Sequence, residues 1–260
     1  MLAALVVVYG ALEAGWVRLR TLELPIDGLP VELDGLRIAH LSDFHLGLPS
    51  LGELATTRAV AWVAERRPDL VCITGDLVSR SRGEARLGRL LERLPEEMYV
   101  VFGNHDFAIS RDPFSQPTQL VGLARGLLLS DESVETEVRG VPVEIAGVDP
   151  RSWLAKRPSN LGSSEAPFRL LLCHFPRVLE RVADGRWHLI LSGHLHAGQI
   201  VLPYGRRNRL LLAHPQSVYR HGVYRRGTTA MHISPGLGTT FVPFRFFARP
   251  EATELVLRSR

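Results

Sequence analysis

The residue types that could do chemistry gather in five clusters, each directly after a segment with the apolar pattern of a strand. The clusters are Asp43-Phe44-His45, Gly75-Asp76, Gly103-Asn104-His105-Asp106, His174 and Gly193-His194-Leu195-His196. Their candidate ligands are carboxylates, imidazoles and one amide, which suit borderline cations such as Mn²⁺, Fe²⁺ or Fe³⁺, Zn²⁺, Ni²⁺ and Co²⁺. Mg²⁺ and Ca²⁺ fit less well, because they prefer shells of oxygen alone. The clusters therefore predict a metal site.

Alternating strands and helices would bring these clusters together. The first half of the chain predicts strands over 36–41, 69–74 and 98–102, separated by helices over 51–66 and 83–94. The second half is richer in strands, which we expect over 134–138, 141–148, 168–173, 189–191 and 254–257. Strand–helix alternation indicates parallel pairing, and ligands of such sheets bind beyond the carboxyl ends of the strands. We expect one α/β domain with two sheets, at a length of 260 residues.

The ordered motifs D-x-H, GD, GNHD, H and GHxH resemble those of the calcineurin-like metallophosphoesterases, in particular the bacterial, membrane-anchored subgroup. The motifs run from Asp43 to His196, and Gly198-Gln199-Ile200, Gly236-Leu237-Gly238 and Arg249-Pro250-Glu251 extend the resemblance toward the C-terminus. Each motif alone is weak, whereas five in order, each at a strand end, form a specific signal. The resemblance implies a four-layer α-β-β-α sandwich with two mixed sheets.

Carried over position by position, the resemblance also implies two divalent cations, with Mn²⁺ favoured. One cation would be held by Asp43, His45, Asp76 and His196, and the other by Asp76, Asn104, His174 and His194. Asp76 would bridge them, because only a carboxylate has two oxygens to share between cations about 3.5 to 4 Å apart. A water between the cations would lose its proton near neutral pH and attack phosphorus as a bridging hydroxide.

The resemblance assigns His105 and Asp106 to catalysis instead of metal binding. His105 would protonate the leaving oxygen or stabilise its charge, and Asp106 would fix the orientation and tautomer of the imidazole. We also predict that Arg245, between Phe244 and Phe246, contacts a substrate phosphate. The implied activity is hydrolysis of a phosphodiester or pyrophosphate, with a lipid-linked or nucleotide-bearing substrate such as UDP-diacylglucosamine.

Two other functions fit the same fold. A non-catalytic protein-interaction scaffold would be expected to lack ligands, whereas here every ligand position is filled. A nuclease of the same superfamily would usually need an added DNA-binding cap, and the residues after His196 leave little room for one. The net charge of +4 comes with no dense basic stripe, and the nearest candidate is Arg206, Arg207 and Arg209. The sequence thus gives no strong nucleic-acid signal.

The remaining histidines and the two cysteines are predicted to lie outside the site. Three histidines sit in mostly apolar segments and fit satisfied core residues: His40, His188 and His232. Two others, His214 and His221, belong to an arginine-bearing region and are expected at the surface or on the substrate side. Cys72 and Cys173 each lie in an apolar run, which predicts reduced, buried thiols.

Residues 2–17 form an apolar segment interrupted only by Glu13. A helix over this stretch would span about 24 Å, less than the roughly 30 Å hydrocarbon core of a bilayer. An interfacial helix and a helix packed on the domain are both compatible, and we favour the remnant of a membrane anchor over residues 1–20, followed by a phosphoesterase domain over 21–260. Arg18 and Arg20 then predict a membrane-associated protein whose catalytic domain faces the cytoplasm.

Overall fold

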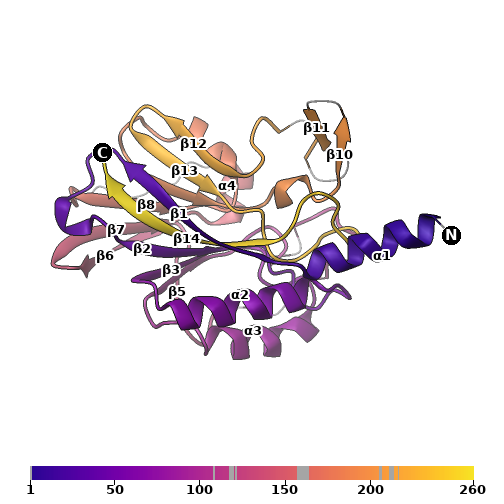
Figure 1. Cartoon of the computed structure of the whole chain (residues 1–260). Helices are drawn as coiled ribbons and strands as arrows, with labels where there is room; N and C mark the ends of the chain where they lie inside the picture. Colours follow the sequence, from indigo (N-terminus) through magenta and orange to yellow (C-terminus); the bar gives the residue numbers. More distant parts are fainter. Residues whose placement is uncertain are drawn as a thin grey trace.

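The computed structural model describes residues 2–107, 109–116, 120, 122–156, 164–204, 207–210, 214–215 and 217–260. Two six-stranded sheets pack face to face in this part of the chain, with helices on the outer faces (Figure 1). The site clusters lie where strands of both sheets end, so the sheet topology decides which side chains can meet.

The first sheet has the strand order β1-β14-β2-β3-β4-β5. The strand bounds are β1 Arg18–Ile26, β14 Glu251–Ser259, β2 Arg37–Leu41, β3 Leu70–Thr74, β4 Met98–Val101 and β5 Leu127–Leu128. Strands β2 to β5 pair in parallel, β14 is antiparallel to β2, and β1 is parallel to β14. The parallel strands therefore end at one edge of a mixed sheet.

The second sheet has the order β12-β13-β9-β8-β7-β6. The strand bounds are β12 Gly222–Arg226, β13 Thr229–Ile233, β9 Leu189–Ser192, β8 Phe168–Leu172, β7 Val141–Gly147 and β6 Glu132–Val138. The four central strands are parallel, and an antiparallel strand closes each side. A separate hairpin joins β10 Val201–Tyr204 to β11 Arg207–Leu210.

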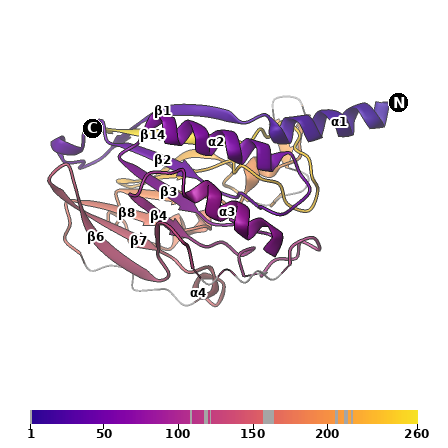
Figure 2. The ribbon, with the colours of Figure 1, turned by 90° about the horizontal axis from the view of Figure 1, so that it is seen from below.

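Helices cover the outer face of each sheet. Helices α2 Gly52–Arg66 and α3 Glu84–Leu91 lie across the first sheet (Figure 2). The outer face of the second sheet packs against shorter elements, α4 Pro150–Leu154 and the 3₁₀ helix η3 Pro176–Glu180. The remaining 3₁₀ turns are η1 Val31–Leu33, η2 Ser81–Gly83 and η4 His196–Gly198. The predicted four-layer α-β-β-α arrangement with two mixed sheets is confirmed.

Burial on both faces explains why the central strands are apolar without alternation. In β3, Leu70 and Cys72 contribute to the core between the two sheets, whereas Val71 and Ile73 belong to the core under α2 and α3. Successive side chains of a strand point to opposite faces, so a strand covered on both sides is apolar at every position. This packing fixes the strand ends from which the site clusters extend.

The predicted strands and helices are all present, with ends shifted by at most three residues. The strands β5, β10, β11, β12 and β13 and the helix α4 were not predicted from the sequence. No strand was predicted over β1, although its alternating polar and apolar residues are typical of a half-buried strand. Strand β1 pairs with β14 along its whole length, from Arg18 with Glu251 to Ile26 with Ser259. The sheet therefore begins at Arg18, inside the range predicted as an anchor remnant.

The N-terminal helix α1, Leu2–Gly15, projects from the sandwich (Figure 1). Its last turn is packed, with Glu13 and Ala14 buried. The Glu13 carboxylate accepts hydrogen bonds from the backbone N–H groups of Phe247 and Ala248, at 3.1 and 2.7 Å. Among the described helices, none is both long enough and apolar enough to span a bilayer.

Candidate metal centre

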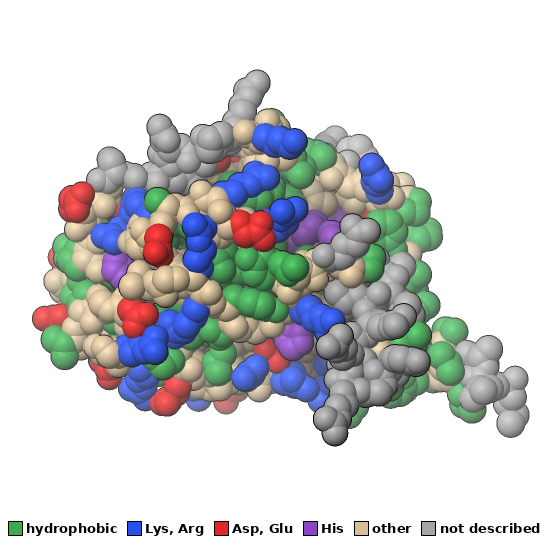
Figure 3. All heavy atoms as spheres, turned by 90° about the horizontal axis from the view of Figure 1, so that it is seen from above, with side chains coloured by type: hydrophobic (Ala, Val, Ile, Leu, Met, Phe, Trp, Pro, Cys, Tyr) green, Lys and Arg blue, Asp and Glu red, His purple; other side chains and the backbone are tan. Residues whose placement is uncertain are grey.

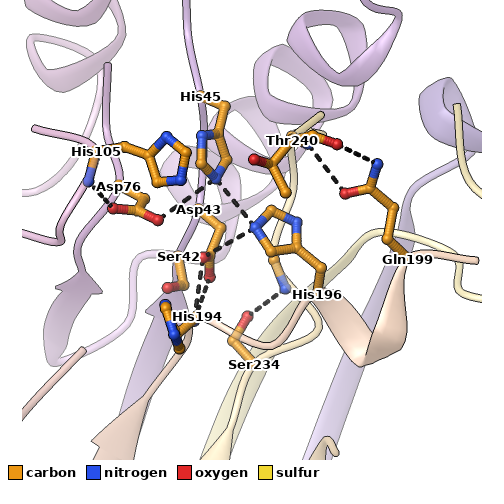
Figure 4. A network of polar contacts seen from close by, with 12 residues as sticks. Ser42, Asp43, His45, Asp76, His105, His194, His196, Gln199, Ser234 and Thr240 are labelled. Carbon is orange, nitrogen blue, oxygen red and sulfur yellow. Dashed lines mark hydrogen bonds and ion pairs between the residues drawn. The ribbon is translucent and has the colours of Figure 1, made fainter. Parts of the chain in front are cut away.

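The five clusters meet beyond the carboxyl ends of β2, β3 and β4 of the first sheet and β8 and β9 of the second. Each strand is buried, and polar residues begin where the strand ends. The candidate ligands on the first sheet are Asp43, His45, Asp76 and Asn104, and those on the second are His174, His194 and His196. The predicted convergence on one crevice is therefore what the fold produces (Figure 4).

The first donor group consists of Asp43, His45, Asp76 and His196, all buried, with ligand atoms within 4.8 Å of one another. His45 Nε2 lies 3.0 Å from His196 Nε2 and 3.6 Å from Asp76 Oδ2. His196 Nε2 lies 3.3 Å from Asp43 Oδ1. Two imidazole nitrogens and two carboxylates thus place their lone pairs close together. A bound cation would stabilise this arrangement by accepting those lone pairs.

The second donor group consists of Asp76, His174 and His194. His174 Nε2 lies 3.1 Å from Asp76 Oδ2 and 3.1 Å from His194 Nδ1. Asp76 belongs to both groups, and its Oδ2 atom faces His45 on one side and His174 on the other. A shared carboxylate is the arrangement expected between two neighbouring cations.

Asn104 supplies an independent test of whether these residues fit a metal. Its Oδ1 atom is buried, and no side chain or backbone group of the described residues donates a hydrogen bond to it. More than nine in ten buried polar groups in proteins have a partner. A buried amide oxygen without a partner, in the loop after β4, therefore fits a metal ligand, and the donor set as a whole suits borderline divalent cations.

Five candidate ligands have a left-handed backbone that few non-glycine residues adopt. Their φ angles are 56° at Asp43, 47° at His45, 55° at Asp76, 73° at His194 and 49° at His196. Such a conformation costs roughly 1 to 3 kcal/mol per residue, and such residues cluster at functional sites. Backbone hydrogen bonds hold two of them in place, from Asp43 N to Gly75 O and from His45 N to Asp76 O, both 2.9 Å. The left-handed conformation is therefore shared by ligands of both donor groups.

Two motif glycines are required because other groups approach them closely. A Cβ atom at Gly103 would overlap the Asp76 carboxylate, and one at Gly193 would overlap Ser42 Oγ and Asp43 Oδ2. Only glycine leaves this space free. The glycines of the GNHD and GHxH motifs therefore permit the close packing of the ligand loops.

The far nitrogens of the ligand imidazoles have partners that the sequence did not reveal. His174 Nδ1 donates to the Thr74 carbonyl at 2.7 Å, which leaves its Nε2 atom facing Asp76. His45 Nδ1 lies 2.8 Å from Ser79 Oγ. Such contacts set the orientation and tautomer of metal-binding histidines. Thr74 and Ser79 belong to none of the sequence motifs, so their contacts with the ligand histidines could be recognised only in the structure.

The protonation states of Asp76, His45 and His194 favour cation binding, whereas His174 must lose a proton to bind a cation. Burial alone would raise the pKa of Asp76, but His174 and His105 nearby bring it well below its usual range. Burial lowers the pKa of both His45 and His194, and neighbouring histidines lower it further. Burial would also lower the pKa of His174, but Asp76 and Asp43 raise it to about 9. A cation would take the place of the proton that His174 holds at neutral pH.

His105 lies beside the first donor group. Its ring centroid is 4.6 Å from that of His45, and its backbone N–H donates to Asp76 Oδ1 at 2.8 Å. The ring nitrogens lie 3.2 Å from Ser115 Oγ and 3.0 Å from Ser110 Oγ. Burial lowers the pKa of His105. The imidazole therefore reaches the site without belonging to either donor group.

Asp106 binds backbone groups of the loops around the site. Its carboxylate accepts hydrogen bonds from the backbone N–H groups of Leu77, Val78 and Gly103, at 2.8 to 3.0 Å. The contacts at the His105 imidazole nitrogens come from serine hydroxyls. Burial raises the pKa of Asp106 to about 7. Asp106 thus ties the GNHD loop to the loop after Asp76.

The prediction that Arg245 contacts a substrate phosphate is not supported by its position. The side chain is fully buried, and its guanidinium donates to the carbonyls of Pro235, Gly238 and Ala248 at 2.6 to 3.0 Å. One nitrogen, Nη2, lies 3.3 Å from His196 Nδ1. Arg245 therefore holds the segment that surrounds His196, and the flanking phenylalanines in the sequence gave no sign of this.

Of the three histidines predicted to be core residues, two are buried and one is half-exposed. His40 of β2 and His232 of β13 are fully buried, and their Nδ1 atoms lie 2.8 Å apart between the two sheets. His188 is only half-buried. The His214 ring lies 4.2 Å from the His194 ring, at the margin of the site.

The two cysteines are buried and unpaired by disulfides, as predicted. Burial raises the pKa of Cys173 to about 12. The structure does not describe the side chains of the three arginines nearest to a basic stripe, which are Arg206, Arg207 and Arg209.

Comparison with known proteins supports this reading of the site. YkoQ of Bacillus subtilis, named an uncharacterized metallophosphoesterase, is 31% identical over 87% of this chain and 85% of its own length. YkuE of the same organism, named likewise, is 30% identical over 89% of this chain and 82% of its own length. A transmembrane protein with metallophosphoesterase domain from Danio rerio is 32% identical over 99% of this chain, which spans 61% of that protein.

The family model of the calcineurin-like phosphoesterases matches residues 36–198. This range begins at β2 and ends with η4, so it includes all five clusters and both donor groups. The chain therefore belongs to the calcineurin-like phosphoesterase family and is a metal-dependent hydrolase of the phosphoesterase type.

Proposed function

We propose that this chain hydrolyses a phosphodiester or pyrophosphate bond with two divalent cations, Mn²⁺ being favoured. Asp43, His45, Asp76 and His196 would hold one cation, and Asp76, Asn104, His174 and His194 the other. The observation that carries the proposal is the position of Asp76, whose Oδ2 atom faces a histidine of each donor group. The open Oδ1 atom of Asn104 supports a second cation beside the first.

When bound, the cations would neutralise charge on the phosphoryl oxygens and make a water acidic enough to supply the nucleophile. The protein residues then have separate tasks. His105 would donate a proton, or a hydrogen bond, to the leaving oxygen from the side of the first donor group. Ser110 and Ser115 would orient the His105 ring, since their hydroxyls lie within 3.2 Å of its nitrogens. Asp106 would keep the loops around His105 and Asp76 together.

Hydrolysis of two nitrophenyl esters tests this proposal. The protein is stripped with a chelator and assayed with bis(p-nitrophenyl) phosphate and p-nitrophenyl phosphate, before and after Mn²⁺ is restored. We expect Mn²⁺ to restore turnover, with the diester hydrolysed faster than the monoester. Full metal binding without turnover of either ester would contradict a hydrolytic role and favour a scaffold. Faster turnover of the monoester would contradict the diester preference alone.

We further propose a membrane-associated enzyme whose catalytic domain faces the cytoplasm and whose substrate is lipid-linked or nucleotide-bearing, for example UDP-diacylglucosamine. Helix α1 supports membrane contact, because its apolar side chains are exposed: Leu5, Val6, Val7, Val8, Tyr9 and Leu12. Phe247, which is 60% exposed, adds to this surface beside Tyr9. The view in Figure 3 includes apolar side chains on the projecting helix. The relative from Danio rerio is named a transmembrane protein.

A further inference from the structure

An apolar pocket with a volume of about 180 Å³ lies beside the candidate metal centre. Three segments form its walls: Leu48 and Pro49, then Phe114, and finally residues 239–243. Each segment is continuous with residues of the site. Leu48 follows the ligand His45 by three positions, and its N–H donates to the His45 carbonyl at 3.4 Å.

The wall at Phe114 adjoins His105. Phe114 precedes Ser115, whose Oγ atom lies 3.2 Å from His105 Nδ1. The Phe114 N–H donates to Asp112 Oδ1 at 2.8 Å, and the Asp112 N–H donates to Ser110 Oγ, which lies 3.0 Å from His105 Nε2. The same network therefore holds the His105 ring and the pocket wall.

The wall at residues 239–243 adjoins the first donor group. Gly238, just before this segment, donates its N–H to the Asp43 carbonyl at 2.6 Å. Thr240 contacts Gln199, as Figure 4 shows: its N–H donates to Gln199 Oε1 and its carbonyl accepts from Gln199 Nε2. The wall at 239–243 is therefore held to the loop that carries the candidate ligand Asp43.

Polar groups of residues 240 and 241 already have hydrogen-bond partners within the protein. The Thr240 hydroxyl and the Phe241 N–H both donate to Asp112 Oδ2, at 2.9 and 3.0 Å. The Thr240 N–H donates to Gln199 Oε1 at 3.0 Å. The side chains that remain around the pocket are mainly leucine, proline, phenylalanine and valine. Such walls favour a hydrocarbon over a nucleobase, because a base needs hydrogen-bond partners when it leaves water.

The pocket also connects to the apolar surface around α1. Residues 239–243 lead directly into Phe244 and Phe246, which lie against Gly10 of α1, with Phe246 5.8 Å from the Tyr9 ring. Exposed apolar side chains of α1 continue from there. The segment that forms one wall of the pocket therefore also packs against the helix that we propose contacts a membrane.

We propose that this pocket receives the alkyl chain of a lipid phosphoester, with the phosphate on the two cations and the chain between Leu48, Phe114 and Val242. This inference rests on the proposed function and specifies its substrate class. At roughly 30 Å³ for a group the size of a water molecule, the pocket has room for about six carbon atoms. Longer chains would extend beyond it toward α1.

Calorimetric binding of n-alkylphosphonates to the Mn²⁺-loaded protein tests the pocket without relying on turnover. Ethyl, butyl, hexyl, octyl and decyl phosphonates are compared below their micelle-forming concentrations. Because a fully buried methylene favours binding by about fourfold, we expect the dissociation constant to fall by up to this factor per methylene as far as hexyl. The gain per methylene should then decline. Equal affinity for ethyl and octyl phosphonate, or no binding of any, would overturn the proposal.

Two variants and a matched control locate the effect. Val242→Trp fills the pocket and Leu48→Asn makes its wall polar, so each should reduce the octyl-to-ethyl affinity ratio at least about tenfold. Val31→Trp changes a residue that is 75% exposed and outside the pocket, and it should leave the ratio unchanged. An unchanged ratio in a folded Val242→Trp or Leu48→Asn variant would contradict the assignment.

Turnover of ethyl p-nitrophenyl phosphate separates this inference from the proposed function. Turnover without any dependence of binding on chain length would refute the alkyl pocket alone. Chain-length-dependent binding without turnover would refute the hydrolytic mechanism and keep the pocket.

Discussion

At the scale of the residue, His105 and the metal ligands differ in what surrounds them. The ligands face one another across short distances, with Asp76 between the two groups. His105 contacts serine hydroxyls and lies edge-on to His45. The two kinds of residue should therefore respond differently to substitution.

His105→Asn should reduce kcat by roughly 10² to 10⁴, the usual contribution of a general acid. Metal content should stay that of the wild type, because His105 belongs to neither donor group. Steady-state kinetics and elemental analysis on the same preparation measure both quantities. Loss of metal along with activity would show that His105 is a ligand.

The positions of site residues could be predicted where they follow from the strand ends, but not where the direction of the side chain decides them. Asp43, Asp76 and His174 follow buried strands, so their convergence could be predicted from the strand ends. Arg245 was misjudged, because its guanidinium turns inward to carbonyls along residues 235–248. The buried role of Glu13, which accepts two backbone hydrogen bonds far along the chain, was equally invisible.

At the scale of the element, the loops after β2 and β9 pack so closely that glycine is needed between them. A Cβ at Gly193 would overlap Ser42 and Asp43, which belong to the loop after β2. The left-handed residues Asp43 and His194 lie at the same contact. Site geometry therefore depends on the approach of two loops from different sheets, which no single motif determines.

Gly193→Ala should separate these loops, weaken metal binding and reduce the free energy of unfolding by about 1 to 3 kcal/mol, a typical effect of overpacking. Gly88→Ala is a matched control within α3, since a Cβ there meets no atom within 4 Å. It should stabilise the protein by roughly 0.5 to 1 kcal/mol, because alanine favours a helix more than glycine does. Urea unfolding and metal titration test both variants, and a tolerated Gly193→Ala would contradict the packing argument.

At the scale of the whole molecule, a histidine pair joins the two sheets. His40 Nδ1 of the first sheet lies 2.8 Å from His232 Nδ1 of the second, and burial lowers the pKa of His40 to about 3. Neutral His40 is therefore favoured in the folded state over the unfolded one, where the pKa is about 6.5. Its stabilising contribution is complete above pH 6.5 and is lost as the pH falls toward 3.

Lowering the pH from 7 to 5 should then cost about 2 kcal/mol of the free energy of unfolding through His40. In the His40→Gln variant, this part of the pH dependence should disappear. Urea unfolding of both proteins at the two pH values gives the difference, in which titrating groups away from the His40–His232 pair cancel. An equal pH dependence in the two proteins would mean that His40 is protonated in the folded state.

The exposed apolar face of α1 gives a second prediction for the whole molecule. Replacing Leu5 and Leu12, each 60% exposed, with serine should reduce binding to phospholipid vesicles at least about tenfold, because two apolar side chains no longer leave water. Val31→Ser, at the exposed turn η1, is the control and should bind as the wild type does. Vesicle co-sedimentation measures the effect, and equal binding of all three proteins would contradict membrane contact through α1.

The central strands follow from the sequence pattern more completely than the first strand and its pairing do. Buried central strands such as β3 are apolar at every position, and this pattern is distinctive. Strand β1 is half-exposed and pairs with β14 from the opposite end of the chain. The residues of β1 do not indicate which distant strand they pair with, so the pairing could be identified only from the structure.

Electron paramagnetic resonance of the protein with two equivalents of Mn²⁺ tests most directly whether Asp76 joins two cations. Ions about 3.5 to 4 Å apart that share a carboxylate are coupled through it. We predict an exchange-coupled spectrum in the wild type, replaced in Asp76→Asn by the signal of isolated or unbound Mn²⁺. A wild-type spectrum of isolated ions at full loading would contradict the shared centre.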